Sequence, residues 1–82
     1  MTREEIEQKV IDMIVYQVSI DASDVTPTKD FVADLGFDSL DSVEMTMVIE
    51  DEFGFDVTDE DAEKLSNLKL LVDYVQKRLA EE

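Results

Sequence analysis

The chain has 82 residues, with 22 acidic against 7 basic side chains and a formal net charge of −15. This length accommodates one domain with a small core, and the excess of acid excludes nucleic acid, which needs basic patches, while favouring partners with basic surfaces. The absence of Cys and His excludes disulfides, thiolate nucleophiles, imidazole bases and the usual zinc sites.

The first predicted element is a helix over about residues 3–17. Thr2 followed three residues later by Glu5 is typical of a capping box at a helix start. The apolar residues that follow have helical spacing; they are Ile6, Val10, Met13, Ile14 and Val18.

A long connection over residues 19–37 follows the first helix. It exceeds the usual helix–helix link, so we expect its apolar residues to anchor it to the core, with a short turn of helix within it. The expected anchors are Val25, Phe31, Val32 and Leu35.

The second predicted helix covers about residues 39–53. Asp38 or Ser39 can cap its start, and Gly54 can end it in the left-handed conformation. Residues 55–58 are expected to form an extended linker, and Thr58 gives a weak cap signal for a short helix over about 59–64.

Ser66 or Asn67 is expected to start the last helix. Its apolar stripe follows the spacing i, i+3, i+4, i+7 and i+11, and consists of Leu68, Leu71, Val72, Val75 and Leu79. No segment alternates as a strand does, and no apolar run approaches the roughly 20 residues of a membrane span. The sequence therefore predicts an all-α fold, a small bundle of three main helices and one short helix, as a single domain over residues 1–82.

A helical wheel separates the faces of the second helix. The stripe that should face the core consists of Met45, Ile49 and Phe53. Leu40 and Val43 lie on another stripe, and we expect them to contact a neighbouring helix. Met47 and Val48 are bordered by acids, which suits an exposed docking patch, although Met47 could equally be a partly buried residue that fills a gap.

The acidic residues are concentrated in the middle of the chain. Residues 30–63 contain thirteen Asp or Glu and no Lys or Arg. This pattern fits either a solvated face that keeps the protein soluble or a surface that attracts basic partners.

Ser39 stands at the start of the second helix. A Ser in this position is most often a cap, and no His, Lys or Cys lies nearby in sequence to activate it as a hydrolase nucleophile. As an acceptor modified by another enzyme it is well placed, because a helix N-terminus offers free N–H groups and a positive dipole end to a phosphodiester. Asp38 and Asp41 oppose this benefit by like charge, and we hypothesise that they help to hold the metal ion of a transferring enzyme.

Four segments together resemble the acyl carrier proteins. Residues 31–45, which include Asp38-Ser39-Leu40, are similar to the family's attachment signature. Residues 50–57, 59–65 and 72–75 are similar to its later segments, in order and with compatible spacing. The resemblance covers essentially the whole chain and is closest in character to the discrete, type-II carriers of fatty acid synthesis.

The resemblance implies a carrier and not an enzyme. A phosphopantetheinyl transferase (holo-carrier synthase) would move 4'-phosphopantetheine from coenzyme A to Ser39, and the arm's thiol would carry acyl chains as thioesters. Fatty acid synthesis enzymes would dock their basic patches on a monomeric carrier, in the cytoplasm or alternatively a mitochondrial or plastid matrix. The implied docking residues are Asp38, Asp41, Glu44, Met47, Glu50 and Asp51.

The family's acyl chain can enter between the helices. The residues that the resemblance places along this route are Phe31, Met45, Thr46, Ile49, Val57, Leu65, Leu71 and Tyr74. Thr46 puts a hydroxyl where an aliphatic residue is usual, Leu71 is bulkier than the usual alanine, and residues 67–70 depart from the usual start of the last helix. These differences leave the pocket size and the acyl length open.

Two other functions remain as alternatives. The chain could be an acidic interaction module or structural subunit in which Ser39 is never modified. It could also bind calcium through the acids of residues 56–61, but an EF-hand loop starting at Asp56 would need Gly where Asp61 stands.

Overall fold

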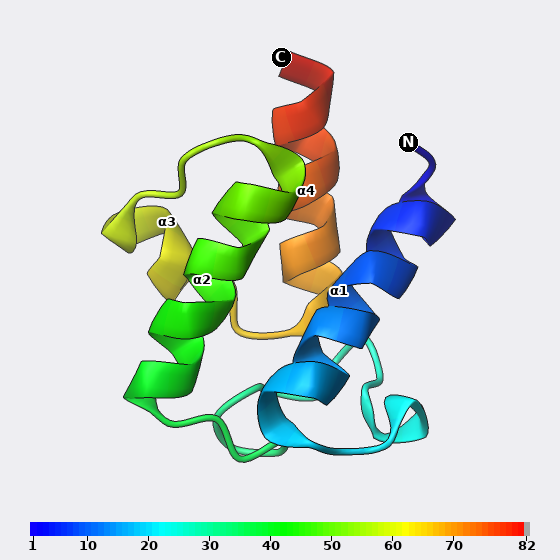
Figure 1. Cartoon of the computed structure of the whole chain (residues 1–82), viewed down its shortest axis with the longest axis vertical. Helices are drawn as coiled ribbons and strands as arrows, with labels where there is room; N and C mark the ends of the chain where they lie inside the picture. The colour runs from blue at the N-terminus through cyan, green and yellow to red at the C-terminus, as the bar shows by residue number, and fades with distance from the viewer. Residues whose placement is uncertain (82) are drawn as a thin grey trace.

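A computed structural model describes residues 1–81. It contains four α-helices and one short 3₁₀ helix (Figure 1). In chain order these elements are α1 (Arg3–Val18), η1 (Ala22–Asp24), α2 (Ser39–Phe53), α3 (Asp59–Glu63) and α4 (Leu68–Glu81). Over these residues no strand forms beyond an isolated bridge between Asp30 and Asn67. The predicted all-α class and the order of the elements are confirmed.

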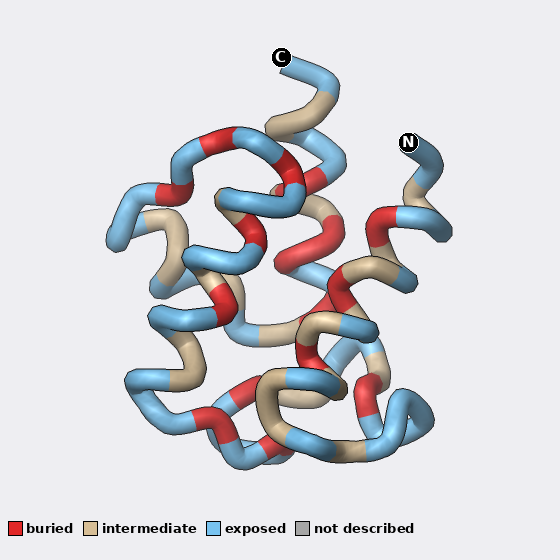
Figure 2. The backbone as a smooth tube through the Cα atoms, in the orientation of Figure 1, coloured by how far each residue is buried: buried red, intermediate tan, exposed pale blue. Residues whose placement is uncertain are grey.

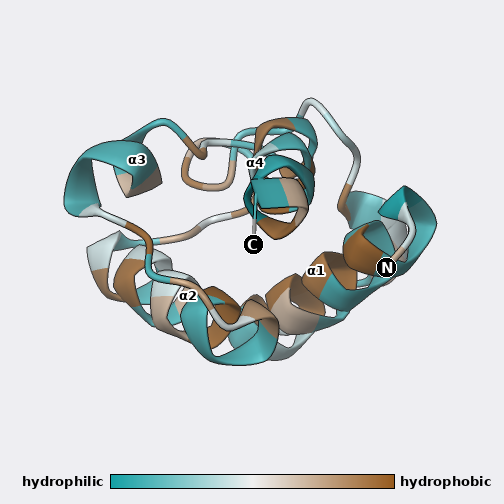
Figure 3. Cartoon of the chain, turned by 90° about the horizontal axis from the view of Figure 1, so that it is seen from above, coloured by the Kyte–Doolittle hydropathy of each residue, from teal (hydrophilic) through white to brown (hydrophobic). Residues whose placement is uncertain are grey.

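The helices form two layers. Seen from above in Figure 3, α1 and α2 form one layer, while α4 lies over the line where they meet and α3 lies over the outer part of α2. Both termini lie at the same end of the molecule (Figure 1). This arrangement leaves the start of α2 at the opposite end, next to the long loop.

The helix boundaries follow the local signals in the sequence. Thr2 and Glu5 form the predicted capping box of α1, and Thr58 caps α3 by accepting from the Asp61 N–H at 3.1 Å. Gly54 ends α2 in the left-handed conformation, with φ 77°. Asn67 Oδ1 accepts from the Leu70 N–H at 2.9 Å, so Asn67 is the residue that caps α4.

The core lies where the inner stripes of α1, α2 and α4 meet, as the buried segments in Figure 2 show. The helical core residues are Ile6, Val10, Ile14, Met45, Ile49, Phe53, Leu68, Leu71, Val72 and Val75. Met13, Val18 and Leu79 of the predicted stripes are half-buried at its margin. The wheel prediction for the inner face of α2 is thus confirmed.

The long loop before α2 is anchored to this core by Val25, Phe31 and Leu35, as predicted. Phe37 is also buried and stacks on Phe31, with ring centroids 5.3 Å apart. Val32 was predicted to be an anchor, and this is wrong. The Asp30 carboxylate accepts from the Val32 and Ala33 N–H groups at 2.9 Å, which forms a tight turn that leaves the Val32 side chain in solvent.

The expectation that Leu40 and Val43 contact a neighbouring helix is also wrong. Their exposed fractions are 63% and 56%. More than half of each side chain is therefore in contact with solvent and is not packed against another helix. Met47 is likewise exposed, which rules out its being a buried residue that fills a gap.

Polar contacts attach α3 and the linker before it to α4. Arg78 Nη1 donates to the Asp56 carbonyl oxygen at 2.8 Å and to the Tyr74 hydroxyl at 2.7 Å, and its guanidinium lies 4.6 Å from the centroid of the Phe55 ring. The Tyr74 hydroxyl donates to Asp61 Oδ2 at 2.9 Å. We call this set, Asp56, Asp61, Tyr74 and Arg78 with the Phe55 ring, the Arg78 clamp.

Within residues 1–81, none of the helices has both the length and the apolar character needed to cross a membrane.

Candidate functional site

Ser39 is the first residue of α2 and is exposed. The preceding Asp38 caps the helix: its Oδ1 accepts from the Asp41 N–H at 2.8 Å, while Asp41 Oδ2 accepts from the Asp38 N–H at 3.1 Å. Asp38, rather than Ser39, is therefore the cap. This leaves the Ser39 hydroxyl free for another role at the open end of the helix.

The electrostatics of this helix start are set by the capping box. The pKa of Asp41 is lowered because it accepts the backbone hydrogen bond from Asp38, and a hydrogen bond from the Gln17 side chain lowers it further. Asp41 is therefore charged at neutral pH, and its charge is directed at N–H groups. Because the chain contains no His or Cys, no imidazole or thiolate is present to activate Ser39.

Ser39 lies on the wall of a cavity of about 800 Å³ between α2, α3 and the loop that carries Phe31. Seven of the eight residues predicted for the acyl route also line this cavity: Phe31, Met45, Thr46, Ile49, Val57, Leu65 and Leu71. The structure thus brings a modifiable hydroxyl and a largely apolar hollow together in one place.

Tyr74 does not line the cavity, so its predicted place there is wrong. Its hydroxyl belongs to the Arg78 clamp, and its ring meets the Phe55 ring edge-on, with centroids 6.1 Å apart. Burial raises the pKa of Tyr74, and its hydrogen bond to Asp61 acts in the same direction. A Tyr packs its ring but directs its polar end to a partner, and both partners here lie away from the cavity.

The two departures from the family pattern have different surroundings. The Thr46 hydroxyl donates to the Ser42 carbonyl oxygen at 3.0 Å, so it is satisfied by its own helix and leaves no unpaired donor in the cavity. Leu71 has no exposed surface and forms part of the inner wall.

Sequence reasoning missed several residues that line the cavity. They are Asp30, Val32, Ser42, Val43, Met47, Glu50, Asp59, Ala62, Glu63 and Ser66. Those on α2 could have been found, since Ser42 and Val43 follow Ser39 by three and four residues and so lie on the same side of the helix. Those around α3 could not, because no local pattern shows how α3 is placed.

Some of the residues predicted for docking are exposed, and some of them are hydrogen-bonded to other parts of the protein. Met47, Glu44 and Asp51 are exposed on α2. Gln17 Nε2 donates to Glu44 Oε2 at 2.6 Å and to Asp41 Oδ1 at 3.3 Å, which links these acids to α1.

Glu50 has a structural contact of its own. Its Oε2 accepts from the Val57 N–H at 2.8 Å, and the side chain is half-buried. This bond fastens the linker after α2 to the last turns of the helix, so Glu50 is less available to a partner than its neighbour Asp51.

An exposed apolar group follows Ser39 along α2. It consists of Leu40, Val43 and Met47, and the acids Asp38, Glu44 and Asp51 lie around it. Apolar residues bordered by charge are typical of protein docking surfaces.

Over the described part of the chain, no three Asp, Glu, His or Cys side chains are grouped so as to hold a metal ion. Asp61, one of the acids considered for calcium, instead accepts the hydrogen bond of Tyr74.

Comparison with known proteins agrees with this geometry. A family model described as a phosphopantetheine attachment site matches residues 8–75. The structure is similar to that of an acyl carrier protein from Enterococcus faecalis, with 42% sequence identity and a TM-score of 0.81, over 94% of this chain and 98% of that chain.

Proposed function

This chain belongs to the acyl carrier protein family. We propose that a phosphopantetheine arm is attached to Ser39 and that the protein carries intermediates of fatty acid synthesis on this arm. Members of the family are carriers rather than enzymes, and their cofactor is 4'-phosphopantetheine. The observation that carries the proposal is the position of Ser39, exposed at the start of α2 and on the wall of the cavity.

The start of α2 suits the phosphodiester that links such an arm to a serine. The open helix end offers N–H groups and the positive end of the dipole to the phosphate. Asp38 and Asp41 carry like charge, but each accepts a backbone N–H of the other, which directs their charge into the capping box. The arm supplies a terminal thiol, which holds an acyl group as a thioester, and this explains how a chain without Cys can form one.

The cavity beside Ser39 provides a place for an acyl chain. Phe31, Ile49 and Leu71 give it apolar walls, and the Thr46 hydroxyl is already bonded to its own helix. Glu50, Asp59 and Glu63 also line it, and their charges favour an entry that faces water. Apolar surface removed from water here contributes about 25 cal/mol per Å² to holding the chain.

The partners that fit this site are a phosphopantetheinyl transferase and fatty acid synthesis enzymes with basic patches around the arm's entrance. Glu44 and Asp51 would attract such patches, and Leu40, Val43 and Met47 would make the apolar contact. A net charge of −15 opposes association of two copies, so we propose a monomeric carrier.

The decisive experiment is the intact mass of the protein after incubation with coenzyme A and a phosphopantetheinyl transferase. We expect the mass to rise by one phosphopantetheine group in wild type and in Ser42→Ala, the matched control one turn along the cavity wall, and no rise in Ser39→Ala.

A mass gain that persists in Ser39→Ala would overturn the assignment of the site. Natively isolated protein that lacks the arm and keeps its partners after Ser39→Ala would instead favour an interaction module.

A further inference from the structure

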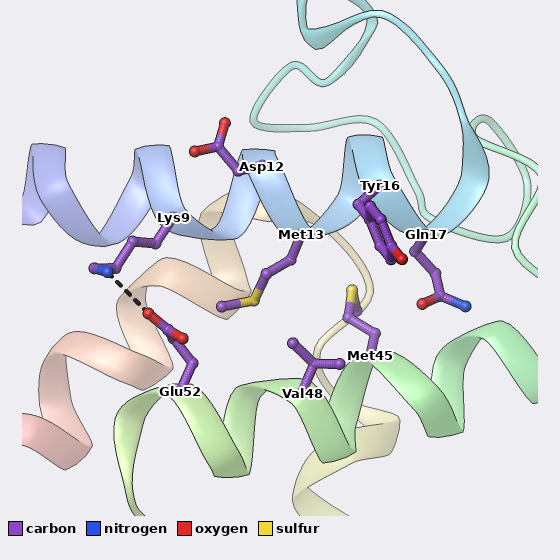
Figure 4. Close-up of a pocket in the computed structure, with 8 residues that line it drawn as sticks. All are labelled: Lys9, Asp12, Met13, Tyr16, Gln17, Met45, Val48 and Glu52. Carbon is purple, nitrogen blue, oxygen red and sulfur yellow. Dashed lines mark hydrogen bonds and ion pairs between the residues drawn. The ribbon is translucent and has the colours of Figure 1, made fainter.

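A second hollow, of about 410 Å³, lies on the side of α2 that faces α1. Figure 4 shows Met13 of α1 and Met45 and Val48 of α2 pointing into the space between the two helices, with Tyr16 of α1 at its border. Ser39 does not line this hollow, which we call the α1–α2 groove. Most of the surface that its wall exposes is apolar, although charged residues also line it and the protein as a whole is very acidic.

The groove exposes an unusual amount of apolar side chain. The exposed fraction is 89% for Tyr16 and 41% for Val48, and the two border the same hollow. Single exposed apolar residues are normal, but adjoining ones around a depression mark binding surfaces. An aromatic ring at the rim and methionines in the wall suit docking, since Tyr is a frequent anchor and Met adapts to varied partners.

Polar bridges between α1 and α2 close the two ends of the groove. Lys9 Nζ pairs with Glu52 Oε1 at 2.8 Å at one end, as Figure 4 shows. Gln17 Nε2 donates to Glu44 and Asp41 at the other end. The groove is therefore a slot with a polar bridge at each end.

The charge around the slot indicates what kind of molecule fits it. Asp12 and Glu52 line the groove, and the bridge at the Gln17 end adds Asp41 and Glu44. Lys9 is the one base that lines it, and its charge is already paired with Glu52. This surface attracts cations and repels both anionic lipids and a second copy of a chain whose net charge is −15.

We propose that the α1–α2 groove is a second docking site, for a partner protein that inserts an apolar side chain flanked by Lys or Arg. Ser39 lines the other hollow, between α2 and α3, and does not line the groove, so a partner seated in the groove leaves the Ser39 hydroxyl uncovered. Docking there does not depend on the arm, so it can coincide with the presentation of the arm to another enzyme.

The probe for the test is an amphipathic helical peptide of Lys and Leu with a single Trp. The chain contains no Trp, so the fluorescence of the peptide reports its burial without background. The position is read from NMR of ¹³C-methyl-labelled methionines in the full chain. We expect the Met13 signal to shift on peptide addition and the Met47 signal, on the cavity side of α2, to stay in place.

Variants test the same site by affinity. Tyr16→Ala and Val48→Ser should each weaken peptide binding about tenfold. Leu70→Ser is the matched control, because Leu70 on α4 has the same exposed fraction as Val48, 41%, and lies outside the groove. It should leave the affinity within about twofold, and so should Ser39→Ala.

Three results would overturn the proposal. One is a shift of Met47 without a shift of Met13, which would place the peptide beside Ser39. Another is unchanged affinity in both groove variants. The third is self-association of the chain in sedimentation that Tyr16→Ala abolishes, which would make the occupant a second copy. The mass experiment on Ser39 is independent of all three, so failure of this proposal and failure of the carrier assignment are distinguishable.

Discussion

The two sides of α2 are held by different forces. Toward α1 and α4, side chains such as Val10, Ile14 and Val75 have no exposed surface and pack the core. Toward α3, which contains no buried residue, the polar contacts of the Arg78 clamp add to the packing of half-buried Ala62 and Leu65 against the core. The large cavity lies on the clamped side, between α2 and α3.

This difference assigns the stability of the fold to one side of α2 and access to the cavity to the other side. Packing of buried apolar side chains is close and non-directional, so it keeps three helices in fixed positions. A few hydrogen bonds contribute about 1 kcal/mol each and can open locally while the rest of the fold persists. The structure thus combines a fixed platform, formed by α1, α2 and α4, with a more weakly held wall beside Ser39.

The largest expected effect comes from truncating the packed side. Ile14→Ala should lower the free energy of unfolding by about 2–5 kcal/mol, because it leaves a cavity in the core. Leu65→Ala removes a side chain of the same size, but Leu65 is half-buried beside α3, so we expect a loss of only about 1 kcal/mol. Urea denaturation followed by circular dichroism measures both. Equal losses would contradict the division into two sides.

Breaking the Arg78 clamp should weaken the attachment of α3 and leave the packed side of α2 unchanged. Arg78→Ala removes the hydrogen bonds to Asp56 and Tyr74 and the stacking on Phe55. We expect hydrogen exchange of the α3 amides to quicken by the equivalent of about 1–2 kcal/mol, with little change in α1. Lys77→Ala, at an exposed neighbouring position, is the control and should leave exchange unchanged. Faster exchange in α1 as well would show that the two sides unfold together.

The helix caps give a matched pair of smaller effects. Thr2 caps α1 and Thr58 caps α3, and each hydroxyl accepts a backbone N–H three residues on. Replacement of either by Ala should cost about 1 kcal/mol. For Thr2→Ala we expect a lower urea midpoint for the whole domain. For Thr58→Ala we expect mainly faster hydrogen exchange of the α3 amides. The comparison fails if Thr58→Ala lowers the midpoint as much as Thr2→Ala does.

The smallest effect concerns a polar contact on the packed side. Asp73 binds Arg3 at 2.7 Å and Lys69 at 3.2 Å, and these hydrogen bonds lower its pKa. A lowered pKa in the folded state means that the contribution is present at neutral pH and is lost as pH falls through that value. Asp73→Asn should cost a few tenths of a kcal/mol at pH 7, since exposed ion pairs contribute little.

The pH dependence provides the check on Asp73. Stability curves of wild type and Asp73→Asn should converge in acid, where Asp73 is protonated in both folded and unfolded protein. Asp24→Asn, an exposed acid on η1, makes the same charge change and controls for the general repulsion within an acidic chain. A gap between wild type and Asp73→Asn that persists at low pH would show that the effect is not electrostatic.

The sequence predicted the parts of the fold that depend on local signals. The capping box at Thr2, the end of α2 at Gly54 and the buried stripe of α4 all depend on residues within a few positions of one another. Such signals fix where a helix starts and which of its faces is apolar. They do not show which element lies opposite an apolar residue, and for this reason Leu40 and Val43 were wrongly expected to contact another helix.

The candidate site was predictable to a similar extent. Ser39 and seven of the residues that line the cavity followed from resemblance to the carriers, and the structure places them together. Tyr74 was misplaced because its two partners, Asp61 and Arg78, come from elsewhere in the chain and only the fold brings them to its hydroxyl. The contact of Glu50 with the linker was missed for the same reason.

The Arg78 clamp also gives the protein an intrinsic optical probe, the Tyr74 side chain. The chain has two tyrosines and no tryptophan: Tyr16 is solvent-exposed beside α2, and Tyr74 sits in the clamp. In Tyr16→Phe the remaining phenol reports on the Arg78 clamp, and because burial raises the pKa of Tyr74, its ultraviolet absorbance should change at higher pH than a free tyrosine's. Loading the cavity with an acyl chain that displaces α3 would move this alkaline transition, giving an optical signal of cargo without any added label.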